Sequence, residues 1–350
     1  MLHLGRSLAK MSRKAYVNTT LVVALLLFAS AFYYLPYYVT KPGMAKELEP
    51  IIEVSGGDRA EGSFMLTTVR MGRANIYSYL LAKWSDYQEI YPEASVRGED
   101  ETDEEYNVRQ LHLMDTSKNH AIKVAYDHAG KEFSYQYLGV FVLDVHEDMP
   151  AAGILKAGDQ IIQVDRLSFD SSQQFIDYIA TKKAGDTVDI VYKREETEKQ
   201  ATITLQAFKD KPNQVGLGIS LDDATRVITV PKVSIDSEQI GGPSAGLMFS
   251  LEIYNQLTKG DLTQGYQIAG TGTIDEEGKV GPIGGIQQKI VAADKSGADI
   301  FFAPNEEGNP HSNYQEALVA AKDINTKMKI VPVDHFTDAL HYLKTLEDKK

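Results

Sequence analysis

The segment Gly241-Gly242-Pro243-Ser244-Ala245-Gly246-Leu247 places a serine between small residues, directly after a turn-forming Gly-Gly-Pro. Leu247 and Leu251 lie four residues apart, at the spacing of one buried helical stripe, which predicts a helix that begins near Pro243. Proline is tolerated in the first turn of a helix, because the amide hydrogen that it lacks would have no intrahelical partner there. Ser244 is therefore expected at the N-terminus of a helix.

The first turn of a helix combines backbone amides that have no intrahelical partner with the positive end of the helix dipole. Donors at such a position stabilise the negative charge that develops on the oxygen of a reacting carbonyl. We therefore expect an oxyanion-binding region around Ser244 that includes Gly242, Pro243 and Ala245.

A second helix is predicted directly after Gly284-Gly285. Ile286 and Ile290 share one face at the helical period of 3.6 residues, and Lys289 falls on the same face. Burial disfavours the charged form of a lysine and lowers its pKa. A neutral amine can accept the proton of the Ser244 hydroxyl, so the sequence predicts a serine nucleophile with a lysine base.

The composition limits the classes of function that are open to this chain. Its 350 residues are enough for two or three domains, and a net charge of -13 argues against nucleic acid as a partner. The chain has no cysteine, which excludes disulfides, thiolate zinc sites and cysteine catalysis. The eight histidines are scattered and none is spaced with acidic residues as metal ligands are, so neither a metal nor a cofactor is expected.

The N-terminal region has the pattern of a membrane anchor. Residues 1–18 carry only basic charges, and the uncharged run Leu21–Val39 is long enough to cross a bilayer core of ~30 Å at ~1.5 Å per residue. The pattern predicts a cytoplasmic segment (1–18), a transmembrane helix (19–39) and an extracellular remainder. The alternative is a cleavable signal peptide, because Ala29-Ser30-Ala31 resembles a small-residue cleavage site.

Residues 40–125 are expected to form an N-terminal extracellular segment. Ser63–Arg70 alternates as a strand does, residues 76–84 are apolar at helical spacing, and a helix is predicted from Tyr106 to Ala125. These elements are too small to fold as a domain of their own. We therefore expect them to pack onto the C-terminal unit, so that the module between them is an insertion.

Residues 126–210 are expected to form that separate module. The stretch Gly153-Ile-Leu-Lys-Ala-Gly-Asp-Gln-Ile-Ile162, a helix at Ser172–Ala180 and a closing hairpin make this part similar to a PDZ domain of bacterial surface proteases. The resemblance implies that amides around Leu138, Gly139 and Val140 receive the terminal carboxylate of a peptide, or that a strand adds there. Alternatively, Gly139 marks only a bulge in a small β domain.

Residues 211–350 resemble the proteolytic domain of the Lon family, the Ser-Lys peptidases. The matching residues are Gly242–Gly246 for the nucleophile, Gly284–Lys289 for the base and Thr271-Gly272-Thr273-Ile274 between them. The resemblance implies that Ser244 and Lys289 are catalytic and that Thr271 orients the lysine. The family usually has an acidic residue at the position of Thr273, and an aspartate at that of Gly241.

The order of these parts resembles the membrane-anchored, PDZ-containing Lon-like proteases of Gram-positive bacteria, and within them the streptococcal surface proteases that trim a competence pheromone. The expected fold class is α+β, with a transmembrane helix, a β-rich PDZ domain and an α/β proteolytic domain. No Gly-x-x-x-x-Gly-Lys-Ser/Thr phosphate loop occurs in the sequence, so ATP-independent cleavage of peptides or unfolded segments is expected. A homo-oligomer is one candidate assembly.

Two other readings of the sequence remain open. Gly242–Gly246 also fits the nucleophile elbow of α/β-hydrolases, with Asp323 and either His335 or His341 as the acid and base. In the second alternative, the chain is a membrane-tethered PDZ receptor on a proteolytic scaffold that no longer cleaves.

Overall fold

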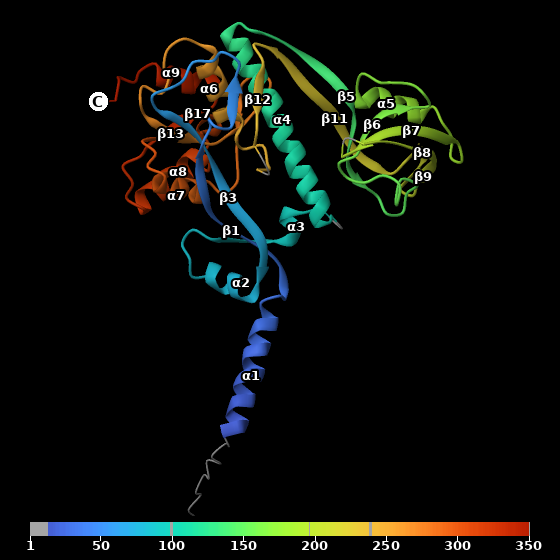
Figure 1. Cartoon of the computed structure of the whole chain (residues 1–350), viewed down its shortest axis with the longest axis horizontal. Coiled ribbons are helices and arrows are strands. Elements are labelled where there is room, and N and C mark those ends of the chain that lie inside the picture. The colour runs from blue at the N-terminus through green and yellow to red at the C-terminus, as the bar shows by residue number, and fades with distance from the viewer. Residues whose placement is uncertain (1–12, 99–100, 196, 238–239, 350) are drawn as a thin grey trace, which may run out of the picture. The chain divides into compact units, whose positions relative to one another are not determined.

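Figure 1 shows the computed structural model of the chain, which describes residues 13–98, 101–195, 197–237 and 240–349. The chain forms two compact units. The first comprises the described residues up to Pro42 together with Val69–Gly98. The second comprises Gly43–Thr68 and the described residues from 101 onward. Both α-helices and β-strands contribute to the fold, which is therefore of mixed α+β class.

The first unit begins with helix α1 (Arg13–Ser30), and strand β1 (Tyr34–Glu47) follows it. The prediction of one helix over residues 19–39 was wrong in extent, because Pro36 and its aromatic and β-branched neighbours favour an extended backbone. Within the described residues, none of the helices combines the length and the apolar character needed to cross a membrane. Residues 1–12 of the expected cytoplasmic segment lie outside the described residues.

The rest of the first unit packs around β1. Strand β4 (Glu89–Pro92) pairs antiparallel with β1, so that Tyr37 lies opposite Pro92. Helix α2 (Ile76–Ala82) begins with a capping box between Asn75 and Ser78, and α3 (Glu93–Val96) is a single turn. The small core of this unit consists of Val39, Ala74 and Ala82, with Tyr37, Tyr79 and Ile90 packed against them.

The second unit contains a parallel sheet in the strand order β17-β16-β13-β3. Residues 63–66 of β3 pair with residues 267–270 of β13, so a strand from the N-terminal third is hydrogen bonded into the C-terminal fold. The PDZ-like module is therefore inserted between two parts of one α/β fold. The bounds of these strands are β3 (Ser63–Asn75), β13 (Gln267–Gly270), β16 (Ile300–Pro304) and β17 (Lys329–Val333).

Helices cover both faces of this sheet, because successive residues of a strand point to opposite sides. Phe302 of β16 packs with α4, α6 and α9, whereas Phe301 packs with α7 and α8. The helices are α4 (Asp103–Ala129), α6 (Gly246–Leu257), α7 (Ile286–Lys295), α8 (Asn313–Asp323) and α9 (Phe336–Leu343). The short elements are β2 (Ile52–Val54) paired with β12 (Val233–Ile235), β14 (Thr273–Ile274) paired with β15 (Val280–Gly281), and the 3-10 turn η1 (Glu306–Gly308).

The inserted module is an antiparallel sheet in the order β11-β5-β6-β7-β8 with helix α5 (Ser172–Ala180) against it. The predicted helix and closing hairpin are confirmed. Its core includes Leu217 and contacts Leu221, so the module extends beyond the boundary expected at residue 210. Its strands are β5 (Glu132–Val145), β6 (Gln160–Val164), β7 (Thr187–Arg194), β8 (Thr197–Thr204), β9 (Gln206–Phe208), β10 (Lys211–Gly216) and β11 (Ile219–Val230).

Candidate active site

Ser244 lies two residues before the first residue of α6, with Ala245 as the residue that caps the helix. The apolar stripe behind it is completely buried, as Leu247 and Leu251 show. Gly246 is required by a close approach: a Cβ there would lie 2.7 Å from Ile274 Cγ2 and 2.8 Å from the Ser117 hydroxyl oxygen. The small residues around the serine therefore allow the start of α6 to sit tightly against its neighbours.

Lys289 lies on α7, and only 3% of its surface is exposed. Its Nζ atom is 2.8 Å from Ser244 Oγ and 2.8 Å from Thr271 Oγ1. Desolvation lowers the pKa of Lys289 from its ordinary value of 10.5 to about 7. A substantial fraction of this lysine is therefore neutral near pH 7, in contact with the serine hydroxyl.

Thr271 sets the direction of the hydrogen bonds in this cluster. It follows β13 directly, is fully buried, and donates its hydroxyl proton to the backbone carbonyl of Ser244 at 3.0 Å. Because that proton is committed, the Thr271 oxygen can only accept from an Nζ–H of Lys289. A neutral Lys289 also carries a lone pair, which can accept the Ser244 hydroxyl proton across the 2.8 Å contact.

The three side chains meet at the carboxyl end of a parallel strand, where open α/β sheets usually carry their sites. Ser244 comes from the start of a helix on one face of the sheet and Lys289 from a helix on the other face. The backbone fastens them: the Gly272 amide donates to the Ser244 carbonyl at 3.0 Å, and the Leu247 amide donates to the Gly272 carbonyl at 3.2 Å. The geometry suits transfer of a proton from serine to lysine.

The backbone amides of the expected oxyanion region differ in the hydrogen bonds that they make. The Gly242 amide donates to the Gln110 carbonyl at 2.8 Å, and Pro243 has no amide hydrogen. The amides of Ser244 and Ala245 donate to no other residue in the part of the chain that the structure describes. These two amides are therefore the donors that can bind an oxyanion, while Gly242 fixes the loop through Gln110.

Helix α4 contributes a residue that the sequence reasoning missed. The Ser117 hydroxyl, which is 3% exposed, donates to the Pro243 carbonyl at 2.9 Å. A signal was present, because Ser117 lies on the same buried stripe as Met114 and Ala121, where a hydroxyl needs a partner.

The prediction that a peptide binds at Leu138, Gly139 and Val140 was wrong. These residues lie in β5, and both edges of β5 are already paired: Val140 lies opposite Ile161 of β6 and opposite Asp223 of β11. A Cβ on Gly139 would lie 2.3 Å from the Ile161 carbonyl oxygen, so the glycine permits close strand pairing. The ladder to β11 shifts register beside it, as in a bulge.

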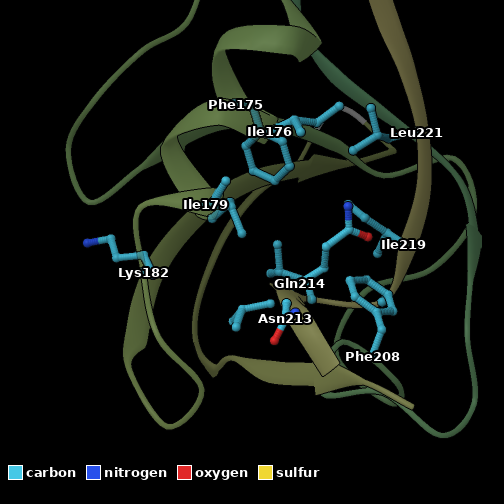
Figure 2. Close-up of a pocket in the computed structure, with 14 residues that line it drawn as sticks. Phe175, Ile176, Ile179, Lys182, Phe208, Asn213, Gln214, Ile219 and Leu221 are labelled. Carbon is cyan, nitrogen blue, oxygen red and sulfur yellow. The ribbon is translucent and has the colours of Figure 1, made fainter. Parts of the chain in front are cut away.

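The groove of the module lies instead between α5 and the outer edge of β11. Figure 2 shows side chains of α5 facing Ile219 and Leu221 of β11 across a pocket of about 300 Å³. The segment Gly216-Leu217-Gly218-Ile219, which connects β10 to β11, also lines it. Two glycines before an alternating strand are the sequence signal that would have indicated this position.

The alternative dyad with histidine does not form at Ser244. The hydrogen-bond partner of Ser244 Oγ in the described part of the chain is Lys289, and His341 Nδ1 lies 3.0 Å from the Thr337 carbonyl of its own helix. His335 caps α9. Among the residues that the structure describes, no group of three or more His, Asp or Glu side chains could hold a metal ion.

Comparisons with known protein families assign both modules. Residues 115–205 match the PDZ domain, and residues 182–345 match the Lon protease (S16) C-terminal proteolytic domain. The two matches overlap at residues 182–205, which the structure places in the PDZ sheet as β7 and β8. Solved PDZ domains of SdrC-like proteins are similar in sequence: 49% identity for Listeria monocytogenes (25% of this chain, 90% of that chain, TM-score 0.23) and 54% for Listeria innocua (24%, 92%, TM-score 0.23).

The curated relatives are Lon proteases. That of Metamycoplasma arthritidis is 25% identical over 210 residues (58% of this chain, 23% of the relative), and that of Campylobacter jejuni is 36% identical over 130 residues (33% and 15%). The chain thus spans less than a quarter of the length of these relatives. With the Ser244–Lys289 geometry, these matches identify a chain that contains a PDZ domain and a Lon-type proteolytic domain of the serine-peptidase class.

Proposed function

We propose that this protein is an endopeptidase in which neutral Lys289 deprotonates Ser244 for attack on a peptide carbonyl. The observation that carries the proposal is the 2.8 Å contact between Lys289 Nζ and Ser244 Oγ in a site dry enough to lower the pKa of Lys289 to about 7. Nucleophile and base are within hydrogen-bond reach, and Thr271 orients the base.

The steps follow from these positions. Ser244 Oγ bonds to the carbonyl carbon while its proton passes to Lys289, and the carbonyl oxygen becomes an oxyanion that the amides of Ser244 and Ala245 stabilise. The protonated lysine gives its proton to the leaving amine, so the peptide bond breaks and an acyl-enzyme remains. Water then attacks the acyl carbon while Lys289 takes its proton. The lysine returns this proton to Ser244 Oγ as the ester bond breaks, which releases the acid product and restores the enzyme.

We propose ATP-independent cleavage of peptides and unfolded segments. This is supported by the absence of a phosphate loop from these 350 residues, because unfolding of a stable substrate requires an energy source. An extended chain is also the form in which a peptide bond can reach a serine at the edge of a sheet.

The PDZ groove is proposed to hold the end of the substrate. β11 is the edge strand of its sheet, so an extended peptide can pair with its free edge beside α5. The amides of Leu217 and Gly218 donate to no other described residue, and they suit a terminal carboxylate. The apolar side chains of Ile179, Ile219 and Leu221 favour an apolar residue at the peptide end.

We further propose that α1 attaches the protein to a membrane, with its basic N-terminal end in the cytoplasm and the catalytic domain outside. Support comes from the lack of any charged residue between Lys14 and Lys41, and from the exposure of the apolar side chains along α1. A cell-surface peptidase with this specificity suits the processing of a secreted signalling peptide.

The test uses the full chain in detergent micelles with a panel of unstructured peptides, followed by mass spectrometry with and without ATP. Cleavage in both conditions, lost in Ser244→Ala and in Lys289→Ala, is the expected result. Cleavage that requires ATP would overturn the ATP-independent mechanism. Peptide binding without cleavage, and no labelling of Ser244 by a serine-directed probe, would favour a catalytically silent PDZ receptor.

A further inference from the structure

Helix α2 carries a stripe of exposed apolar side chains. Tyr77, Leu80, Leu81 and Trp84 follow the i, i+3, i+4, i+7 spacing of one helical face, with Trp84 just after the helix end. Their exposed fractions are 38%, 49%, 63% and 87%. In a globular protein such a stripe normally faces the core, so here it marks a contact surface.

The opposite side of α2 is the one that packs on the protein. Ala82 is buried in the small core of the first unit, and the Tyr79 ring lies 5.1 Å from that of Tyr37 on β1. The helix therefore already has its core-facing side. The exposed stripe is a second apolar face: Tyr77 touches α1 through its hydroxyl, whereas Leu80, Leu81 and Trp84 are left largely exposed.

Hydrogen bonds fasten α2 to the C-terminal end of α1. The Tyr77 hydroxyl donates to the Leu27 carbonyl at 2.9 Å and lies 2.7 Å from Ser30 Oγ. The Asn75 side-chain amide donates to the Ala31 carbonyl at 3.0 Å. Figure 1 shows α2 beside this end of α1. The stripe is thus held at a fixed level along α1.

That level coincides with the end of a long apolar surface. After exposed polar residues in its first half, the C-terminal half of α1 exposes a run of apolar side chains: Leu21, Val22, Val23, Leu25, Leu26, Leu27 and Phe28. Exposed aromatic residues follow at its end: Phe32, Tyr33 and Tyr34. Tryptophan and tyrosine are favoured where hydrocarbon meets the polar headgroups of a bilayer, and the Lys83 side chain next to the stripe suits the headgroup layer.

We propose that α2 is an interfacial membrane helix whose stripe of Tyr77, Leu80, Leu81 and Trp84 lies in the headgroup region of the bilayer that α1 enters. A lipid surface is favoured over a protein partner because the stripe is continuous with the apolar surface of α1. The inference rests on the proposed membrane attachment. Its consequence is that α1 and α2 together fix the protein against the membrane at two points.

The chain offers a direct probe, because Trp84 is its single tryptophan. The full chain is reconstituted into phosphatidylcholine–phosphatidylglycerol vesicles, and flotation confirms its association with them. We expect Trp84 emission to shift to shorter wavelength relative to the emission measured in a Leu80→Glu/Leu81→Glu variant. We also expect quenching by lipids brominated near the headgroup, and loss of quenching by aqueous acrylamide.

The double variant should still float, since α1 is unchanged, but its Trp84 should become accessible to acrylamide. Val319→Glu, on an equally exposed apolar residue of α8, is the matched control and should leave the emission unchanged. A wild-type chain that floats with Trp84 open to acrylamide would overturn the inference. So would a blue shift without quenching by brominated lipid, which would indicate a protein contact. A chain that does not float would overturn the membrane attachment, and the inference with it.

Discussion

The Ser117 hydroxyl donates a 2.9 Å hydrogen bond to the carbonyl of Pro243, the residue directly before the candidate nucleophile. That peptide unit ends in the Ser244 amide, which is one of the two donors open to an oxyanion. Ser117 therefore acts on the reaction through the backbone, as a positioning residue. Its influence should appear in the transition state, where the oxyanion forms, more than in the binding of substrate.

Replacement of Ser117 by alanine tests this relationship. We expect kcat to fall by about tenfold with little change in KM, since the oxyanion donors lose alignment, and the fold to lose about 1 kcal/mol of stability. Ser250→Ala is the matched control: Ser250 is also buried, and among the described residues its hydroxyl bonds two carbonyls of its own helix. Equal losses of kcat in the two variants would show that Ser117 acts through stability alone.

The dependence of activity on pH follows from the lowered pKa of Lys289. Only the neutral amine accepts the serine proton, so kcat/KM should rise with pH through about 7 and then level off. The measurement is the rate of peptide cleavage from pH 5 to pH 9. A rate that is flat across this range would contradict the assignment of Lys289 as the base.

Thr271 should matter through its hydroxyl rather than its shape. Thr271→Val keeps the volume but removes both the donor to the Ser244 carbonyl and the acceptor for Lys289, so we expect kcat to fall by about 10–100-fold. Thr271→Ser keeps the hydroxyl and should retain most of the activity. Steady-state kinetics of both variants provide the check, and similar rates for the two would remove Thr271 from the site.

The buried lysine should cost the fold stability at neutral and acidic pH. Its folded-state pKa of about 7 lies below the ordinary value of 10.5, so below pH 7 the folded state must hold a charge that it disfavours. Wild-type stability should therefore rise as the pH increases from 7 to 10.5. Lys289→Met should raise stability at pH 6 by roughly 2–4 kcal/mol and abolish cleavage. Denaturant titration of wild type and Lys289→Met at pH 6 provides the check. Equal free energies of unfolding for the two proteins would show that the lysine is well solvated.

A second buried ionisable group lies in the helix that follows the nucleophile. Burial raises the pKa of Glu252 from 4.5 to about 7, although the Gln256 side-chain amide donates to it at 2.6 Å. Because the folded state disfavours the charged carboxylate, wild-type stability should fall as the pH rises from 4.5 to 7. Glu252→Gln should be the more stable protein at pH 8, by about 3 kcal/mol, and should lose this pH dependence. The free energy of unfolding is measured at pH 5 and pH 8 for both proteins. The same change in this free energy between the two pH values in wild type and variant would refute the prediction.

Local sequence patterns predicted the parts of the site that depend on one helix each. Ser244 before a buried stripe and Lys289 on a buried stripe need only the 3.6-residue period, and both helices are present. The same reasoning gave α5 and the β7–β8 hairpin. The contact between Ser244, Lys289 and Thr271 was implied by family resemblance, since no periodicity brings three separate segments together.

Features that depend on pairing between distant segments were not predictable. Gly139 was assigned to a peptide site because a glycine before an apolar strand looks the same whether the strand edge is free or paired. The use of the Gly242 amide by Gln110 is likewise a contact between segments far apart in sequence. The end of α1 at Ser30 was missed because an apolar, aromatic run satisfies both a helix and a strand until Pro36 is weighed.

The strands that lead into and out of the inserted module are neighbours. β5 and β11 form one antiparallel ladder, from Glu132 opposite Val230 to Val145 opposite Ile219. The strand that leads into the module and the strand that leads out of it are therefore paired along their length. The chain therefore enters and leaves the module through one two-stranded stem, and α4 also contacts it, for example where His112 lies 2.9 Å from Asp222. Recombination within that stem would exchange the inserted module for another and leave the catalytic residues unaltered. One cleavage chemistry could acquire new substrates in this way.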